Sequence, residues 1–229
     1  MTPRAPAEPG AMRPALFHFS EDPDIRVFVP RPVRVGIDRG AARAWLNGPL
    51  VWAIAADFCL LYLFPRDCPR IVIWPTAETT PEDRQAWFGD VTGRAVAYVE
   101  EAWAERIAGG TIQRYRMPPG TFEPAGDPGA WVSRHAIVPE CRDTLRNLPA
   151  AMAAAGLELR ILPRLKPLAP VWTSTLHASG IRLRNAQDWV TPEGGPPRPI
   201  PRDRTGCGDD RAPGTEERAA VRFRLDESG

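Results

Sequence analysis

The side chains best suited to chemistry begin near the start of the chain, around His18. The imidazole stands between Phe17 and Phe19, and the hydroxyl of Ser20 follows two positions later. Side chains alternate between the two faces of a strand, so His18 is expected on the face opposite the two phenylalanines. An imidazole can donate a hydrogen bond to a ligand hydroxyl. The alternative is a structural histidine that bonds to a nearby loop.

Two aromatic residues and a group of arginines complete the candidate set. Trp52 and Tyr62 offer flat faces that can stack on a ligand ring, including a cationic one. Arg26, Arg31 and Arg34 follow the first predicted strand. A guanidinium can bind a phosphate through two parallel hydrogen bonds. The alternatives are core aromatics and a solvated arginine-rich loop.

The elements that must position these residues are read from apolar runs and breaker residues. Strands are predicted at 15–19, 50–54, 70–74, 111–117, around Phe122, at 130–138 and at 157–162. Helices are predicted at 55–64, from Thr80 onward, at 94–107, 143–155 and 168–176, and residues 181–185 are extended or a last turn. The strands outnumber the helices and do not alternate strictly with them. This order favours the α+β class.

Three regions follow from composition. Residues 1–13 are predicted to be a flexible leader, and residues 14–189 a single α+β domain. Residues 190–229 are dense in Pro, Gly and charged side chains and carry few apolar ones. Such a segment cannot bury enough apolar area to offset the entropy of ordering it, so a disordered tail is predicted.

Charge and motif content exclude several classes of function. The 229 residues carry a formal net charge of +1, which gives no global field to attract nucleic acid or an acidic membrane. No apolar run reaches the ~18 residues of a membrane span, and no signal peptide is recognised, so a cytoplasmic location is expected.

Phosphate-binding glycine loops and metalloprotease motifs are missing. The four cysteines have no metal-binding spacing, so we expect free thiols and no metal.

Several short strings resemble, in order, a family of uncharacterised bacterial proteins defined by a domain of unknown function. The resemblance runs from about Leu16 to Ala186 and brings no known activity. The strings are HFSEDP from His18, VWAI from Val51, LYLFPRDCPR from Leu61, STL from Ser174 and IRLRNA from Ile181.

A more distant pattern resembles the ADP-ribosyltransferase fold, a split and mainly antiparallel sheet with flanking helices that holds NAD in its cleft. The resemblance implies that His18 contacts the nicotinamide ribose and that Ser20 helps to hold the amide. It implies that Trp52 is the aromatic of the second strand and that Tyr62 closes over the nicotinamide ring. Arg31 would then meet the pyrophosphate.

The active transferases of that fold place a glutamate on a later strand, and no residue here matches it. Two functions therefore stay open. One is a NAD-type nucleotide-binding protein or an ADP-ribosyl- or phosphotransferase-like enzyme with no assigned catalytic residue. The other is a non-catalytic interaction or regulatory module that keeps the fold without the chemistry. Each implies a different partner, a nucleotide in the first case and an unidentified protein in the second.

Overall fold

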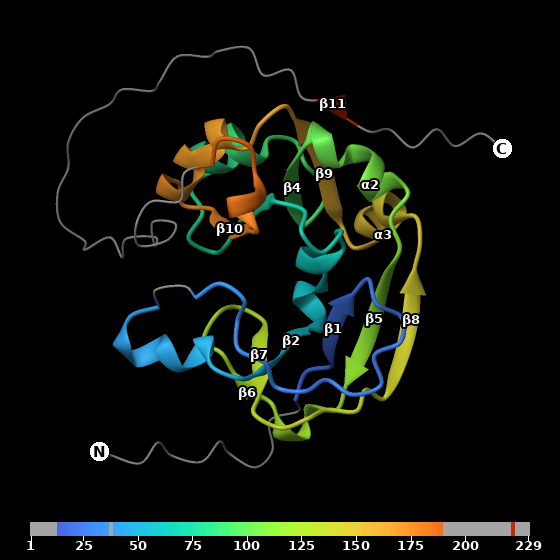
Figure 1. The fold of residues 1–229 in the computed structure, drawn as a ribbon. Helices are drawn as coiled ribbons and strands as arrows, with labels where there is room; N and C mark the ends of the chain where they lie inside the picture. The colour runs from blue at the N-terminus through green and yellow to red at the C-terminus, as the bar shows by residue number, and fades with distance from the viewer. Residues whose placement is uncertain (1–12, 37–38, 190–220, 223–229) are drawn as a thin grey trace. The chain divides into compact units, whose positions relative to one another are not determined.

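The computed structural model describes residues 13–36, 39–189 and 221–222, which gather into two compact units (Figure 1). Unit 1 contains the residues up to Tyr62 together with Gln113–Thr144. Unit 2 contains Leu63–Ile112 and the residues from Leu145 onward. The domain predicted at 14–189 is divided between them. The leader predicted at 1–13 and the tail predicted at 190–229 lie almost entirely outside the described residues.

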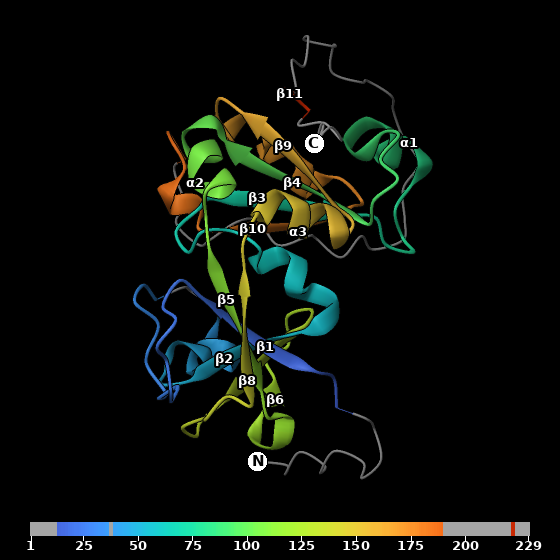
Figure 2. The ribbon, with the colours of Figure 1, turned by 90° about the vertical axis from the view of Figure 1, so that its right-hand side faces the viewer.

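Unit 1 is built on a six-stranded sheet in the order β6-β7-β2-β1-β5-β8 (Figures 1 and 2). The ladders β1–β2, β1–β5, β2–β7 and β6–β7 are antiparallel. The strands are β1 (Leu16–Ser20), β2 (Val51–Ala55), β5 (Ile112–Met117), β6 (Glu123–Pro124), β7 (Ala130–Ser133) and β8 (Cys141–Leu145). Short 3₁₀ helices of this unit are Ala41–Asn47, Ala56–Tyr62 and Pro119–Thr121.

Each face of this sheet carries its own apolar cluster. Residues paired across a ladder point to the same face, so Leu16 lies with Ala55, and Trp52 lies with Val132. We call the side of Leu16 the first face. Its cluster is Leu16, Phe28, Val51, Ala53, Ala55, Tyr115, Met117, Phe122 and Ile137. We call the side of Trp52 the second face. There Trp52 and Ala130 pack against Leu46, Leu50, Ala125 and Val132.

Unit 2 contains a five-stranded mixed sheet in the order β10-β3-β4-β9-β11. Only the β4–β9 ladder is parallel among those described. The strands are β3 (Arg70–Trp74), β4 (Ala95–Glu100), β9 (Leu157–Leu162), β10 (His177–Ile181) and β11 (Val221–Arg222). The helices are α1 (Pro81–Asp83), a π turn (Arg84–Phe88), α2 (Ala104–Ala108), α3 (Leu148–Ala154) and 3₁₀ segments Glu101–Trp103, Lys166–Thr173 and Leu183–Asn185.

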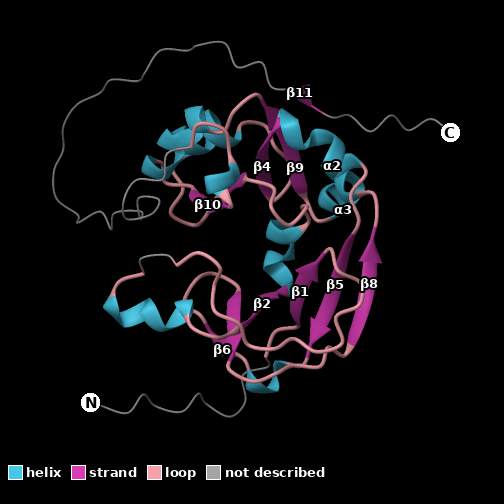
Figure 3. Cartoon of the chain, in the orientation of Figure 1, coloured by secondary structure: helices cyan, strands magenta, loops and turns pink. Residues whose placement is uncertain are grey.

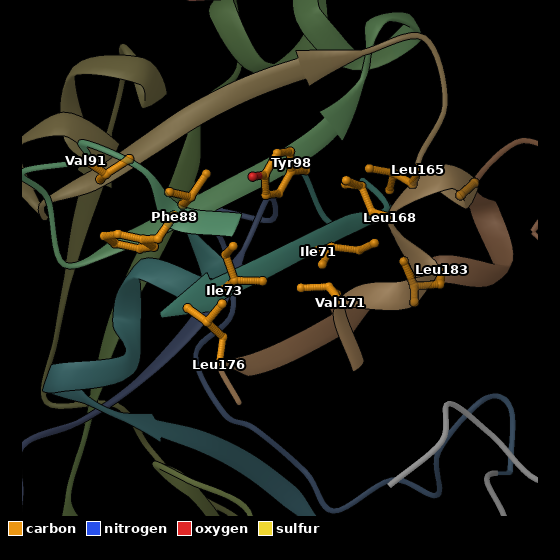
Figure 4. Packing of buried hydrophobic residues seen from close by; sticks show 12 residues of the cluster. Ile71, Ile73, Phe88, Val91, Tyr98, Leu165, Leu168, Val171, Leu176 and Leu183 are labelled. Carbon is orange, nitrogen blue, oxygen red and sulfur yellow. The ribbon is translucent and has the colours of Figure 1, made fainter. Parts of the chain in front are cut away.

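The core of unit 2 forms where apolar side chains of β3 and β4 meet those of the 3₁₀ segments (Figure 4). Ile71 and Ile73 of β3 are fully buried, and Phe88 and Leu165 close over them from the connecting segments. Both units mix strands with short helices (Figure 3), which confirms the predicted α+β class. None of the helices in the described part of the chain has the length and apolarity needed to cross a membrane.

The helix predicted at 94–107 is wrong over its first half, which is strand β4. All six residues of β4 are buried, so both faces of this strand are covered, and its edges pair with β3 and β9. A strand covered on both faces is apolar at nearly every position, as β4 is before Glu100, and loses the alternation that identifies half-exposed strands. The run of Ala and Val with a later Trp therefore resembled a helix.

The helix predicted at 143–155 is also wrong at its start, where Cys141–Leu145 forms β8. The helix begins only after Asn147, whose side-chain oxygen accepts a hydrogen bond from the Ala150 N–H at 3.3 Å. Strand β10 was not predicted, because His177–Ile181 has small residues and no apolar alternation. The strands predicted at 15–19, 50–54, 70–74 and 157–162 are confirmed to within a residue.

Candidate functional site

His18 lies at the centre of β1, with its ring on the first face of the sheet. The ring centroid lies 4.6 Å from that of Phe28. Its Nδ1 atom lies 2.8 Å from the carbonyl oxygen of Trp52. A carbonyl oxygen only accepts hydrogen bonds, so Nδ1 carries the proton and donates. The backbone of β2 thus fixes both the orientation and the tautomer of the imidazole.

Ser20 is buried at the end of β1 and shapes the loop that follows. Its hydroxyl oxygen accepts a hydrogen bond from the Asp22 N–H at 3.1 Å. The Asp22 carboxylate in turn accepts one from the Asp24 N–H at 2.9 Å. Side-chain turns of this kind replace backbone pairing where a strand ends. The hydroxyl predicted to hold a ligand amide therefore holds the loop after β1.

Trp52 and Tyr62 lie on the other side of the sheet from His18. The Trp52 ring packs in the second-face cluster, and the Tyr62 ring lies nearly parallel to Phe19 at 6.2 Å between centroids. Phe19 alternates with His18 along β1 and so points to the second face. The structure therefore brings His18 and Ser20 together on one face and Trp52 and Tyr62 on the other. A single pocket lined by all four side chains does not form.

Arg31 is exposed on the connection between β1 and β2. Its backbone pairs with Leu50, donating at 3.3 Å and accepting at 3.1 Å. This bridge ties the connection to the start of β2. The role of the Arg31 guanidinium in binding a pyrophosphate stays a prediction.

A hollow of about 240 Å³ lies in unit 1 beside the loop after β1. Tyr115 of β5, in register with His18, forms part of its lining. The rings of Phe28 and Tyr115 meet edge to face at 5.1 Å, so three aromatic rings connect His18 with the hollow. The hollow is lined by Pro23, Asp24, Ile25, Arg26, Tyr115, Pro139, Cys141 and Arg142.

Hydrogen bonds across the hollow hold its two rims in place. The phenol of Tyr115 donates to the Asp22 carbonyl oxygen at 2.7 Å and accepts from the Ile25 N–H at 3.4 Å. The guanidinium of Arg142 donates to the carbonyl oxygen of Pro23. The loop after β1 is thus tied to β5 and to β8 by side chains. Loops that carry binding residues are usually mobile, and these hydrogen bonds restrain the loop after β1.

The charge in this hollow is positive. Arg26 and Arg142 contribute two positive charges to the lining, and Asp24 contributes one negative charge. Arg26 is exposed, and no ion pair to it occurs among the described residues. Cys141, whose thiol is free, also lines the hollow. Arg26 was a sequence candidate, but Tyr115 and Arg142 were not, since only the pairing of β5 and β8 brings them to this loop.

A second polar cluster lies beside Trp52 on the second face. The guanidinium carbon of Arg39 lies 5.7 Å from the centre of the Trp52 ring. Asp127 forms ion pairs with Arg43 at 2.8 Å and with Arg39 at 3.7 Å. The Arg39 Nε and the Trp52 Nε1 are buried and have no hydrogen-bond partner within the described residues. Each buried donor without an acceptor costs about 1–3 kcal/mol, so these two need an explanation.

Polar side chains of unit 2 hold its connecting segments in place, and one such contact joins two of the strings quoted above. The buried carboxylate of Glu100 accepts hydrogen bonds from the backbone N–H groups of Leu165 at 3.2 Å and Gln187 at 3.0 Å. Asn185 donates from its side chain to the carbonyl oxygen of Asp67 at 2.7 Å. The string at 65–70 is therefore bonded to the string at 181–186. These contacts hold the 3₁₀ segments of unit 2 against β4.

Thr175, in the string STL, is part of another structural network. Its hydroxyl donates to the Asp83 carboxylate at 2.6 Å, and its backbone N–H donates to the same oxygen at 2.7 Å. The hydroxyl of Thr80 caps α1 by accepting from the Asp83 N–H at 3.2 Å. These polar groups stabilise a helix start, as expected of a hydroxyl cap. Within the described residues, no group of three or more His, Cys, Asp or Glu side chains is placed to hold a metal ion.

The comparisons with known proteins identify one family. The model of that family, described as Family of unknown function (DUF6886), matches residues 17–186. No curated protein and no solved structure matches the chain. The ADP-ribosyltransferase resemblance gains no support from these comparisons. The matched range covers well over half of the chain and includes all the strings quoted above, so the chain belongs to the Family of unknown function DUF6886.

Proposed function

We propose that unit 1 binds a small phosphate-bearing ligand of the nucleotide class in the hollow beside the loop after β1. The observation that supports this proposal is the meeting of Arg26 and Arg142 in one hollow with a single carboxylate, Asp24. A guanidinium offers a planar fork of N–H donors that matches phosphate oxygens. NAD is the nucleotide that the sequence resemblance suggests.

The size of the hollow favours a phosphate or pyrophosphate group as the part that enters it. Its volume of about 240 Å³ lies just below the ~300–1,000 Å³ of pockets that enclose a drug-sized ligand. The nucleoside would then extend over the open side. Tyr115 lines the hollow, and Ser20 positions the loop by accepting a hydrogen bond from the Asp22 N–H. The proposed function is binding and requires no catalytic glutamate.

The test is calorimetric titration of the full-length chain with ADP-ribose, NAD and inorganic phosphate. We expect Arg26→Ala and Arg142→Ala each to weaken nucleotide binding by about 10–100-fold, because a charge-assisted hydrogen bond contributes about 1.5–3 kcal/mol. Arg134→Ala is the matched control. It removes an exposed arginine of unit 1 that pairs with Glu123 and does not line the hollow.

The choice of ligand separates this proposal from the site suggested by the transferase resemblance. Recognition through phosphates predicts similar affinities for NAD and ADP-ribose. A strong preference for NAD that disappears in His18→Ala would instead favour the nicotinamide site predicted from the sequence. Nucleotide binding that is undetectable at millimolar concentration, or unchanged in both arginine variants, would contradict the proposal.

A further inference from the structure

The sheet of unit 2 ends at a two-residue strand that comes from near the end of the chain. Strand β11 pairs antiparallel with β9, with Val221 opposite Ile161 and Arg222 opposite Arg160. It is the last strand of this sheet among the described residues, so it occupies the edge that β9 would otherwise expose. The family region ends at residue 186, so β11 lies outside it.

The register of this ladder determines which residues would meet if β11 continued. In an antiparallel ladder, each step forward along one strand is a step back along the other. The next three residues of the chain would then stand opposite the first three residues of β9, which gives the pairs Phe223 with Leu159, Arg224 with Glu158, and Leu225 with Leu157. The ladder would then cover β9 back to its first residue.

The apolar residues agree in this register. Leu157, Leu159 and Ile161 alternate along β9 and so share one face. Leu157 and Ile161 are buried, but Leu159 between them is only half-buried. An apolar residue opposite Leu159 would remove more of its surface from water. A shift of one residue in either direction would instead place Phe223 opposite Glu158 or Arg160.

The charged residues agree as well. Glu158 is half-buried, and one of its oxygens accepts a hydrogen bond from the Arg160 Nε at 2.8 Å. A carboxylate has a second oxygen that can accept from another guanidinium, and Arg224 stands opposite it in this register. The one like-charged pair, Arg222 with Arg160, is next to this same carboxylate. The opposite edge strand, β10, carries no carboxylate.

We propose that residues 221–225 are a docking segment that binds the edge of β9 within the same chain and completes the sheet of unit 2 as a five-residue strand. Residues 190–220 connect this segment to the family region and would reach ~100 Å if fully extended, so chain length does not restrict the choice of edge. The proposed contact lies in unit 2 and shares no residue with the hollow of unit 1. The two proposals can therefore fail independently.

Disulfide cross-linking of the full-length chain tests the register. With Cys141→Ser and Cys207→Ser as background, the double variants are Leu159→Cys with Phe223→Cys and Glu158→Cys with Arg224→Cys. Opposed pairs alternate between a closer and a wider spacing along an antiparallel ladder, so one of these neighbouring pairs has the closer spacing. We expect at least one of them to form a disulfide within a single chain under mild oxidation. Leu159→Cys with the natural Cys207 retained is the control and should cross-link far more slowly.

Hydrogen exchange measured by mass spectrometry tests the docking without added cysteines. Phe223→Asp should remove protection from the peptide that contains β9, because a carboxylate opposite Leu159 disfavours docking and exposes the edge of the strand. Ile200→Asp makes the same kind of change elsewhere in the tail and should leave that peptide unchanged.

Three results would overturn the proposal. One is equal protection of β9 in Phe223→Asp and Ile200→Asp. Another is cross-linking of both designed pairs no faster than that of the Cys207 control. The third is a disulfide that joins two chains instead of forming within one, since the edge would then be occupied by the segment of a second copy.

Discussion

Cys68 has no exposed surface, and burial raises the pKa of its thiol from 9.0 to about 12. The positive charges of Arg70 and Arg106 act in the opposite direction but are outweighed. Burial likewise raises the pKa of Cys59 to about 11. Both thiols therefore stay neutral at physiological pH. Both are free, as the sequence interpretation expected.

The raised pKa of Cys68 predicts a loss of stability in alkali. Above about pH 9 the thiol ionises in the unfolded chain but not in the folded one, so the unfolded state has lost a proton that the folded state keeps. The stabilising contribution is complete below that pH and is lost as the pH rises toward about 12. Urea unfolding of Cys68→Ala should show a shallower alkaline fall than the unchanged protein, by up to ~1.4 kcal/mol per pH unit. Cys141→Ala, at an exposed thiol, should follow the unchanged protein, and parallel curves for all three would contradict the prediction.

The backbone conformation of Gly129 gives a second prediction about a single residue. Its φ is +69°, and an added Cβ would lie 2.3 Å from the Cδ2 atom of Phe58. Gly129→Ala should therefore lower the free energy of unfolding by at least ~1–2 kcal/mol, the cost of the left-handed backbone alone. Gly120 in the same unit has open space around it, so Gly120→Ala is the control. Equal urea midpoints for the two variants would disprove this reading.

Among the elements, β4 contributes most to the organisation of unit 2. It lies between β3 and β9, and its last residue, Glu100, bonds two backbone N–H groups of the segments that cover the sheet. Those segments contain little regular hydrogen bonding of their own, because 3₁₀ turns are short. A single carboxylate thus positions Leu165 and Gln187 together.

Removal of the Glu100 carboxylate should destabilise unit 2 strongly. Glu100→Ala leaves the buried N–H of Leu165 without this acceptor, at a cost of about 1–3 kcal/mol, and also removes the acceptor of the N–H of Gln187, an exposed residue. Glu100→Gln keeps one acceptor oxygen and should lose less. Denaturant unfolding followed by circular dichroism measures the difference. Glu101→Ala, at the exposed neighbour, should change little, and an Ala variant at position 100 as stable as that control would refute the role.

The sequence predicted most strands of unit 1 but not which side chains meet. Alternation along β1 placed His18 opposite Phe17 and Phe19, and the structure confirms it. The face of Trp52 depends on the register between β1 and β2, and a shift of one residue would reverse it. Nothing in the local pattern sets that register. For the same reason the sequence did not predict that Tyr115 and Arg142 line the hollow, because they reach it only through the pairing of distant strands.

Across the whole molecule, the chain passes between the two units three times, after Tyr62, Ile112 and Thr144. Each unit is therefore assembled from two separate stretches of sequence, with a stretch of the other unit between them. A fragment that ends at Ile112 keeps β1 and β2 but lacks β7 and nearly all of β5. The central strands of unit 1 would then expose unpaired edges, which promote aggregation.

We therefore expect the fragment 1–112 to be insoluble or unfolded when expressed alone. Coexpression with the fragment 113–229 should recover a soluble pair, because the missing strands are then supplied in trans. Solubility and far-ultraviolet circular dichroism measure both outcomes. A soluble fragment 1–112 with native-like strand content would show that β1 and β2 need no partner from beyond Ile112.

The residues on the two rims of the hollow lie far apart in the sequence, and this has a consequence for biosynthesis. The loop after β1 leaves the ribosome early, but its binding partners at 139–142 are translated more than a hundred residues later. Contacts of such long range form late, after the loop-closure entropy has been paid. The proposed phosphate-bearing ligand could therefore bind a nascent chain only after residue 142 had emerged from the ribosome, while the rest of the chain was still being made.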